Sequence, residues 1–462
     1  MPRTLAPHIS WRRAWRGVDR SQGCELLTRG ALALSRPSAK TFGMKSGEPS
    51  TTETLTTRCC VAGGGPAGMM AAFLLARAGV DVVLLEKHAD FFRDFRGDTI
   101  HPSTLELFHE LGLLDEFLKL PHSEAREISG FVGDEKVTVA DFTHLPTRCK
   151  FVALMPQWDF LNFLGEKAKA YPSFRLAMGA EASELVVEDE RVVGVIAKQG
   201  ATWIEIRADL TIGADGRHSI LRDRAGLERI EFGAPMDVLW FRLPRREGDP
   251  HETFGRFGTG RAMVLLDRGD YWQCGFIIPK GGYEARERLG LAAFRGEIAG
   301  LAPFLADRVE TLKSWDDIRL LSVALDRLKD WSRPGLLFIG DAAHAMSPVG
   351  GVGVNLAIQD AVASANILAE PLARGPVGPE LLAAVQRRRE WPASATQAVQ
   401  RQIQHRVIGN VLAGAAVTKL PLPLRLLRAF PILRRIPARI VGLGFRPEHI
   451  RSPEAPPAPS PR

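Results

Sequence analysis

The chain has 462 residues, 45% of them hydrophobic, which is enough apolar material for a substantial core and two folded domains. Its formal net charge of +7 is carried by the two ends: residues 1–43 contribute +6 and residues 418–462 contribute +7, so the middle carries −6. This distribution argues against a basic nucleic-acid-binding surface, and no run of about 18 apolar residues indicates a transmembrane helix.

Residues 1–43 are rich in arginine and poor in acidic side chains, which is typical of a mitochondrial transit peptide. They lack the regular amphipathic, serine-rich pattern of such peptides, so we favour an upstream start codon ahead of Met44. We predict that residues 1–56 are a disordered or non-native extension. The five cysteines have no paired spacing, which favours a reducing, cytoplasmic location and argues against disulfides or a metal site.

The segment RCCVAGGGPAGMMAAFLLARAGVDVVLLEK, residues 58–87, predicts a complete unit of strand, turn, helix and strand. We expect strands over 59–62 and 82–85, with a helix over 66–78 between them. Gly63, Gly65 and Gly68 in the turn have the spacing G-x-G-x-x-G. In this context the spacing predicts a dinucleotide site, because the glycines let a pyrophosphate approach the helix N-terminus.

Glu86 ends the second strand of this unit, where its carboxylate would accept hydrogen bonds from adenosine ribose hydroxyls. The following segments predict a loop and a helix within 93–120, a second helix over 158–171, a strand meander over 174–207 and further strands over 233–325. Beyond Ala361 the chain is expected to be helical and rich in arginine, with a frayed, proline-rich end over 452–462.

Two later segments repeat the design of a strand, a Gly/Asp turn and a helix. ADLTIGADG ends a buried-type strand just before a helix that begins at Ser219, and the apolar run 336–339 stops at Gly340 and Asp341 before helical spacing begins at Asn355. The carboxyl ends of strands in an open α/β sheet are where such folds bind ligands. We therefore expect the three turns to form one site.

With these three motifs in this order, residues 58–370 resemble the flavin-dependent aromatic hydroxylases of the p-hydroxybenzoate hydroxylase type. The resemblance implies an α/β fold in which a Rossmann-type FAD-binding domain is interleaved with a smaller α+β substrate domain built on a mostly antiparallel sheet. It also implies a set of FAD-binding residues: Gly63, Gly65, Gly68, Glu86, Lys87, Arg96, Gln157, Asp215, Asp341, Pro348, Gly351, Val352 and Asn355.

Two of these residues receive further roles from the resemblance. Arg96 is the candidate catalytic residue, which positions the flavin and assists its reaction with the nicotinamide, although a purely structural role is equally open. Asp215 corresponds to a residue that serves both FAD and the transient nicotinamide nucleotide. The segment SPVGGVGVN departs from the family pattern at Ser347 and Val354, a minor difference.

Physical reasoning supports a flavin cradle at residues 348–355. A reduced flavin carries negative charge, so it needs hydrogen-bond donors, and the backbone N–H groups from Gly351 to Asn355 at a helix start would supply them. Pro348 and the glycines keep side chains away from the ring. Asp341 would bind a ribityl hydroxyl, with a helix N-cap as the alternative, and His344 is given no chemical role.

The chain has one G-x-G-x-x-G and no redox cysteine pair, which argues against a pyridine-nucleotide–disulfide reductase. The resemblance implies a monooxygenase that uses NAD(P)H and O2 to hydroxylate an electron-rich, hydrophobic aromatic substrate through a flavin C4a-hydroperoxide. An FAD-dependent dehydrogenase or reductase of a lipid or isoprenoid is the alternative, and a non-enzymatic flavoprotein is a third possibility. WQCGFIIP lacks the spacing of the halogenase motif WxWxIP, so a halogenase is a distant rival.

We assign the FAD-binding domain to 57–232 and 318–375, the substrate domain to 233–317, to which 126–150 could contribute, and a basic helical segment with a disordered tail to 376–462. The substrate wall is expected from aromatic and aliphatic side chains at sheet spacing, although for any one of them ordinary core is the favoured interpretation. These residues are Trp240, Phe241, Met263, Leu265, Trp272, Phe276 and Ile278.

The segment TKLPLPLRLLRAFPILRRIPARIVGLGF, residues 418–445, alternates apolar residues with arginine. Four prolines prevent one continuous helix, so we favour a segment folded over the substrate domain with solvated arginines. A weak peripheral contact with an anionic membrane is the alternative. Neither the substrate nor the oligomeric state follows from the sequence.

Overall fold

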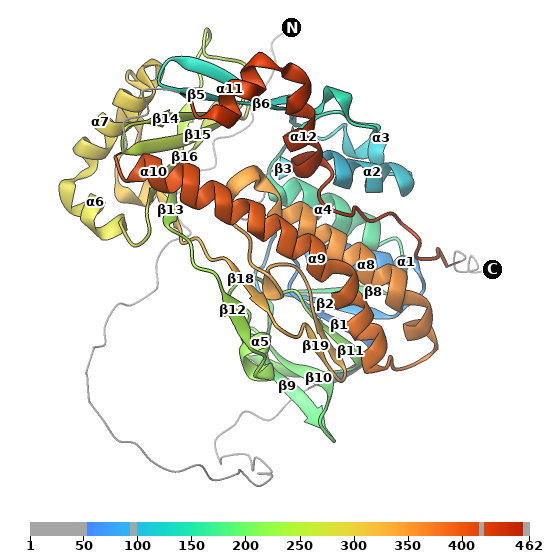
Figure 1. Ribbon diagram of the computed structural model, residues 1–462. Coiled ribbons are helices and arrows are strands. Elements are labelled where there is room, and N and C mark those ends of the chain that lie inside the picture. The colour runs from blue at the N-terminus through green and yellow to red at the C-terminus, as the bar shows by residue number, and fades with distance from the viewer. Residues whose placement is uncertain (1–52, 93–98, 415–419, 456–462) are drawn as a thin grey trace, which may run out of the picture. The chain divides into compact units, whose positions relative to one another are not determined.

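The computed structural model describes residues 53–92, 99–414 and 420–455, all within the unit that spans 50–462. The predictions for residues 1–52 and for Arg96 fall outside these ranges. The expectation of disorder is wrong for residues 53–56, which pair with β11 as the start of β1. Figure 1 shows two large sheets, with the long helices α8 and α9 running side by side.

The first sheet is built on parallel strands in the order β20, β11, β1, β2 and β8, with β19 antiparallel at one edge and β9 and β10 extending from β11. The strands are β1 (Glu53–Ala62), β2 (Val82–Glu86), β8 (Phe174–Met178), β9 (Ala180–Glu188), β10 (Arg191–Gln199), β11 (Thr202–Gly213), β19 (Ser332–Arg333) and β20 (Leu336–Phe338). The first strand begins six residues before the predicted Cys59, because its polar start Glu53–Arg58 pairs with β11.

The helix α1 packs beside this sheet through an almost entirely apolar surface. α1 buries ten of its twelve residues and contacts α8 and α4, which explains why its sequence lacks a clear polar stripe. The helices on this side of the molecule are α1 (Pro66–Arg77), α2 (Pro102–Glu110), α3 (Leu114–Phe117), α4 (Gln157–Ala168), α5 (Ile220–Ala225), α8 (Gly353–Arg374) and α9 (Pro379–Ile403).

One helix region, Val349–Arg374, is long and apolar enough to cross a membrane by length and composition. Its most apolar window is 72% buried inside the protein, where it packs on α1 and α9. This helix is therefore part of the core beside the first sheet.

The second sheet has seven strands and is antiparallel except where β14 pairs with β5. In spatial order they are β17 (Arg319–Leu321), β13 (Met236–Pro244), β16 (Tyr271–Pro279), β15 (Arg261–Asp267), β14 (Phe254–Gly258), β5 (Glu127–Val132) and β6 (Glu135–Asp141). β5 and β6 thus reach this sheet from a distant part of the sequence. Two helices that the strand pattern did not predict, α6 (Tyr283–Leu289) and α7 (Leu291–Leu301), follow β16.

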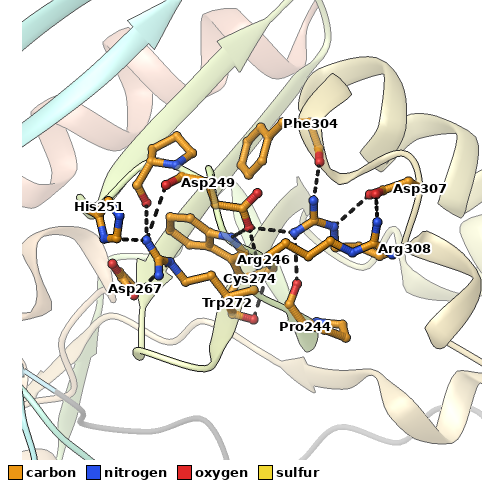
Figure 2. Close-up of polar contacts among 12 residues, drawn as sticks. Pro244, Arg246, Asp249, His251, Asp267, Trp272, Cys274, Phe304, Asp307 and Arg308 are labelled. Atoms are coloured by element: carbon orange, nitrogen blue, oxygen red, sulfur yellow. Dashed lines mark hydrogen bonds and ion pairs between the residues drawn. The ribbon is translucent and has the colours of Figure 1, made fainter.

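Figure 2 shows a polar network at the end of the second sheet, among residues between Pro244 and Arg308. The Asp249 carboxylate accepts hydrogen bonds from Trp272 Nε1 at 2.9 Å and from Arg308 Nη1 at 2.6 Å, and all three side chains are buried. Burial alone would raise the pKa of Asp249, but the bonds to Arg308, the backbone and Trp272 outweigh it and hold the pKa below its usual value. The pair fastens the loop after β13 to the segment around Arg308.

Two smaller sheets complete the fold: β3 (Thr99–Ile100), β7 (Val152–Leu154) and β4 (Ser123–Ala125) form one, and β12 (Arg229–Glu231) and β18 (Asp326–Leu328) form the other. After α9 a π-helical turn over Gln404–Ile408 continues into α10 (Gly409–Leu412). α11 (Leu422–Ala429), a 3-10 turn over Pro431–Arg434 and α12 (Arg435–Gly442) then follow.

α11 and α12 pack against β6, so the segment folds over the second sheet as we favoured, and the prolines interrupt it as expected. The expectation of a frayed end is wrong for residues 452–455. Arg77 donates a hydrogen bond to the Ser452 carbonyl oxygen, and Ala455 N donates to the Arg77 carbonyl oxygen at 2.8 Å. The backbone of this short stretch is fixed because it satisfies groups at the end of α1.

Candidate functional site

The three predicted turns meet at one edge of the first sheet. Ala62 lies beside Gly213, and Gly213 beside Phe338, in parallel register. The backbone continues this pairing past the strand ends, since Ala214 N donates to the Ala62 carbonyl oxygen at 2.8 Å and Ile339 N to the Gly213 carbonyl oxygen at 3.0 Å. The structure thus brings together segments that lie more than 270 residues apart in the sequence.

The glycines of the first turn have three different surroundings. Gly63 has a φ of +107°, and a Cβ there would lie 2.4 Å from the Ala214 carbonyl oxygen. A Cβ on Gly68 would lie 1.9 Å from the Gly63 carbonyl oxygen, whereas a Cβ on Gly65 would meet no atom within 4 Å. Gly63 and Gly68 are therefore required by the protein's own packing, and Gly65 faces open space at the start of α1.

Glu86 is buried at the end of β2, and its carboxylate binds this turn. One oxygen accepts a hydrogen bond from Gly64 N at 3.1 Å, and the other accepts one from His88 N at 2.8 Å. Lys87 points elsewhere: its side chain is exposed, and Nζ lies 3.9 Å from Glu181. Glu86 therefore lies beside the glycine turn, while Lys87 does not face it.

Asp215 lies in the second turn with one carboxylate oxygen bonded and the other without a partner. Leu221 N donates to Oδ2 at 3.3 Å, while Oδ1 is buried and has no hydrogen-bond partner among the described residues. Burial raises the pKa of Asp215, and its hydrogen bonds only partly oppose this. A buried oxygen that lacks a partner is costly unless a ligand supplies the donor.

Asp341 of the third turn forms an ion pair that the sequence did not indicate. Arg217 Nη2, immediately after the GADG motif, donates to Asp341 Oδ2 at 3.1 Å, and both side chains are partly exposed. Arg217 thereby joins the second and third turns. A basic residue directly after an acidic turn was the available signal, but only the parallel register placed it opposite Asp341.

The start of α8 is held against the segment before α2. Thr99 Oγ1 donates to the Gly351 carbonyl oxygen at 2.9 Å, and Gly351 has a φ of +64°. The Asn355 side chain accepts hydrogen bonds from His101 N and Thr104 Oγ1, each at 2.8 Å. The Asn355 Nδ2 donates to the Thr99 carbonyl oxygen at 3.0 Å, so both ends of this side chain hold the segment 99–104.

The remaining donors at this helix start are backbone groups. Gly351 N, predicted as a donor to the flavin, instead donates to the Pro348 carbonyl oxygen at 3.0 Å. The first bond of helical type runs from Leu356 N to the Val352 carbonyl oxygen, so the N–H groups from Val352 to Asn355 have no partner within the helix. Pro348 and Val352 are half-buried beside them. Gln157 is buried as the first residue of α4.

A buried charge network beneath the third turn was missed by the sequence reasoning. The Asp360 carboxylate accepts hydrogen bonds from His344 Nε2 at 2.6 Å, Gly340 N at 3.1 Å and Arg389 Nε at 3.0 Å. Burial alone would raise the pKa of Asp360, but His344 and Arg389 outweigh it and hold the pKa below its usual value. An acid on an apolar helix was the signal, because such a residue must be paired.

Most residues of the predicted substrate wall are ordinary core, which is the interpretation that we favoured for each of them singly. Six of its seven residues belong to a closed core with α7, and Trp240 alone lies on the opposite face. The physical reason is strand alternation: Trp240 and Phe241 are neighbours and therefore point to opposite faces. The six core residues are Phe241, Met263, Leu265, Trp272, Phe276 and Ile278.

Trp240 lies in a row of residues that crosses five strands. The row continues through Gly275, Val264, Gly255 and Gly130, which are paired in register on β16, β15, β14 and β5. A Cβ on Gly275 would lie 3.0 Å from the Trp240 ring. The missing side chain therefore lets the indole lie close to the sheet.

The Phe257 ring also lies close to the sheet because glycines of this row leave room for it. A Cβ on Gly255 would lie 3.0 Å from its ring, and one on Gly130 would lie 3.5 Å from it. Trp240 and Phe257 are half-buried and pack in the cluster that contains Val349 of the α8 cradle. Trp240 Nε1 is buried without a hydrogen-bond partner among the described residues. We call Trp240 and Phe257 the aromatic floor, and both pack against the same apolar cluster as Val349 of the third motif.

These features fit FAD. The open space at Gly65 and the N-terminus of α1 suit a pyrophosphate, the orphaned oxygen of Asp215 suits a hydroxyl or amide donor, and the backbone N–H groups at the start of α8 suit an anionic ring edge. No cluster of three or more potential metal ligands occurs within the described residues.

Comparison with known proteins gives a consistent result. The model of the FAD binding domain family matches residues 56–402. The 6-methylpretetramide 4-monooxygenase of Streptomyces rimosus is 34% identical over 390 residues, which cover 83% of this chain and 92% of that protein.

Solved structures share the fold at low identity. The probable FAD-dependent monooxygenase PqsL from Pseudomonas aeruginosa aligns with a TM-score of 0.66 at 20% identity, over 78% of this chain and 99% of its own. The flavin-dependent brominase Bmp2 aligns with a TM-score of 0.66 at 16% identity, over 84% and 93%. The fold is thus common to hydroxylating and halogenating flavoproteins, so it does not by itself define the reaction.

Proposed function

Because the chain belongs to the family of FAD-dependent aromatic monooxygenases, we propose that it hydroxylates a planar, fused-ring phenol. The chain is an FAD-dependent oxidoreductase, and NAD(P)H is the typical electron donor of the family. The matched relative is a monooxygenase, so a lipid or isoprenoid dehydrogenase is not favoured. The reaction consumes NAD(P)H, a proton and O2, adds one oxygen atom to the ring and releases the other as water.

The aromatic floor carries the substrate assignment. Trp240 and Phe257 lie close to the sheet over a row that contains three glycines, and they pack against the same apolar cluster as Val349. A flat, extended aromatic molecule would stack on such a surface better than a single small ring, because stacking grows with the overlapping area. The Streptomyces rimosus relative is named for the oxygenation of 6-methylpretetramide.

The cofactor-binding residues follow from the fit of the site. Gly65 and the N-terminus of α1 would receive the pyrophosphate, Glu86 the adenosine ribose, and Asp215 and Asp341 the central part of the cofactor. The start of α8, with Pro348 and Gly351 to Asn355, would lie along the flavin. Gln157 and Arg96 remain assigned by resemblance alone, and Lys87 is the weakest member of the set because its side chain points toward Glu181.

Bound FAD supplies the redox chemistry, and the chain's own residues bind, orient and exclude water. Backbone N–H groups at the start of α8 would stabilise negative charge on the flavin edge, and the Asp360 network would hold the Gly340 turn in position. Trp240 Nε1 would donate a hydrogen bond to a phenolic or carbonyl oxygen of the substrate.

The domain arrangement is part of the same proposal. The first sheet with its helices would form the FAD-binding domain, over 57–232 and 318–375. The second sheet would form the substrate domain, over 233–317 with β5 and β6 contributed from 126–150, and β17 (Arg319–Leu321) would extend it past the predicted boundary because it pairs with β13. The strand pairing of β14 with β5 supports this division.

The test measures oxidation of NADH and NADPH by the FAD-loaded full chain with resorcinol, a dihydroxynaphthalene and a dihydroxyanthracene. We expect the fused-ring phenols to stimulate oxidation more than resorcinol, with a product heavier by one oxygen atom. Trp240→Ala should reduce this preference. Stimulation by resorcinol equal to that by the larger phenols would contradict the fused-ring assignment, and oxidation without an oxygenated product would contradict the hydroxylase.

A further inference from the structure

The hairpin formed by α11, the turn Pro431–Arg434 and α12 exposes an unusual amount of apolar surface. Fourteen large apolar side chains are exposed in the described part of the chain, and five of them lie within this one hairpin. Leu422, Phe430, Ile432 and Ile436 are each more than half exposed, and Leu426 is 42% exposed. Scattered exposed apolar residues are ordinary, but a contiguous group of this kind marks an interaction surface.

The same hairpin is basic and contains no acid. Arg425, Arg428, Arg435 and Arg439 are exposed, and no Asp or Glu occurs between residues 418 and 447. Arg428 pairs with the exposed Glu135 at 2.7 Å, while Arg434 donates to the Leu427 carbonyl oxygen within the hairpin. The positive charge of this surface is therefore only slightly neutralised by the protein itself.

The hairpin is also anchored, so its outer face is a fixed surface. Ala438 and Gly442 are buried in a small core with Phe142 and Leu145. A Cβ on Gly442 would lie 2.7 Å from Leu145 Cδ1, which shows how closely α12 approaches this core. Figure 1 shows α11 beside β6.

We propose that this hairpin docks the enzyme on an anionic lipid surface. Lipid matches both properties of the hairpin, since acyl chains receive the apolar side chains and anionic headgroups receive the arginines. A second copy of the chain would bring like charges together if the same faces met. A nucleic acid would leave the apolar side chains without a partner.

The docked hairpin contacts the site region directly. His101 Nδ1 donates to the Val441 carbonyl oxygen of α12 at 2.7 Å, and His101 N donates to Asn355 at the start of α8. Burial lowers the pKa of His101 to about 4, so its ring is neutral. If the proposed function holds, an apolar fused-ring substrate would reach the site from the lipid side of α12.

The experiment is co-sedimentation of the FAD-loaded full chain with vesicles of phosphatidylcholine alone or mixed with phosphatidylglycerol, at low and high salt. We expect binding to the mixed vesicles that weakens at high salt. Phe430→Ser with Ile432→Ser should lower binding about tenfold, because less apolar surface inserts. Arg435→Gln with Arg439→Gln should lower it about fivefold for each arginine.

The matched control is Arg288→Gln with Leu289→Ser on α6, which removes one exposed arginine and one exposed apolar residue elsewhere. This variant should bind as the unmodified chain does, and unchanged FAD content would show that every variant folds. Absence of sedimentation at low salt, or equal loss in the control, would overturn the proposal. A lipid-independent dimer that Phe430→Ser dissociates would assign the surface to a second copy instead. None of these outcomes depends on the substrate, so a failed hydroxylation assay leaves the lipid result standing.

Discussion

Two sets of glycines create space in this protein, one at the G-x-G-x-x-G turn and one in the row across the second sheet. In the turn, Gly63 and Gly68 allow backbone segments to approach each other, while Gly65 leaves open space for a ligand. In the row, Gly275, Gly255 and Gly130 make room for the protein's own aromatic rings. The first set would receive the cofactor directly, whereas the second places side chains that would receive the substrate.

Each of the two regions also contains a buried polar atom that has no hydrogen-bond partner among the described residues. Asp215 Oδ1 lies beside the turn, and Trp240 Nε1 lies on the row. Each such atom costs free energy unless a donor, an acceptor or water reaches it, and fourteen of them occur among the described residues. What distinguishes these two regions is therefore the surface around the atom, which is bare backbone in the turn and aromatic rings on the row.

The largest effect is expected for Gly68→Ala. The new Cβ would lie 1.9 Å from the Gly63 carbonyl oxygen, so α1 or the turn must move. We expect a loss of more than about 3 kcal/mol in the free energy of unfolding, or failure to fold. Chemical denaturation measures this, and a stable, FAD-loaded Gly68→Ala variant would show that the turn is looser than the structure indicates.

Gly65→Ala tests the space for the ligand without disturbing the packing of the protein itself. A Cβ at this position meets no protein atom within 4 Å, so the free energy of unfolding should fall by no more than about 1 kcal/mol, the scale of an altered helix start. FAD affinity should fall about 100-fold, because the Cβ enters the space meant for the pyrophosphate. Fluorescence titration of FAD into apoprotein measures the affinity, and an unchanged Kd would remove Gly65 from the cofactor site.

Gly275→Ala makes the corresponding change in the second set. Its Cβ would lie 2.9 Å from Val264 Cγ2 and 3.0 Å from the Trp240 ring, so these side chains must shift. We expect a loss of about 1–3 kcal/mol in stability, lower turnover with a dihydroxyanthracene and unchanged FAD affinity. A change in FAD affinity as large as that of Gly65→Ala would remove the distinction between the two regions.

Asp215→Asn tests the orphaned oxygen at the cofactor turn. Burial raises the pKa of Asp215, so at neutral pH its charge opposes folding of the apoprotein, and the opposition fades as pH falls through the folded-state pKa. The variant should therefore raise the Tm of the apoprotein at pH 7, and its stability should no longer increase as the pH falls through the folded-state pKa of Asp215. It should also weaken FAD binding about tenfold. A lower apoprotein Tm with unchanged FAD affinity would make Asp215 a purely structural residue.

The smallest effect is expected for Trp240→Phe, which keeps an aromatic ring on the glycine row but removes Nε1. Loss of one hydrogen bond to a neutral substrate should raise KM about threefold to tenfold and leave kcat, FAD content and Tm nearly unchanged. Phe257→Leu is the matched control, since it alters the floor without removing a donor. Equal KM changes in both variants would mean that Nε1 makes no bond to the substrate.

Much of the cofactor side could be predicted because its signals are local in sequence. The spacing of Gly63, Gly65 and Gly68, the acid at the end of β2 and the two later turns each lie within a few residues of a strand end. Parallel pairing then makes their convergence a consequence of the fold class. Tertiary contacts changed the details: Asn355 holds the segment 99–104 with its side chain, and Arg217 pairs with Asp341.

The sequence by itself determined the βαβ unit, the three turns and the family, because periodicity and fixed spacing act over short distances. Only the tertiary structure decided which side chains of the second sheet pack in the cluster that contains Val349. This depends on the pairing among β13, β16, β15, β14 and β5. Within each strand, consecutive side chains point to opposite faces of the sheet. The glycine row could not be predicted from the sequence, because strand pairing creates it and its members lie as far apart as residues 130 and 275. The exposure of the α11–α12 hairpin was likewise a tertiary outcome, because burial of Ala438 and Gly442 fixes which apolar residues remain outside.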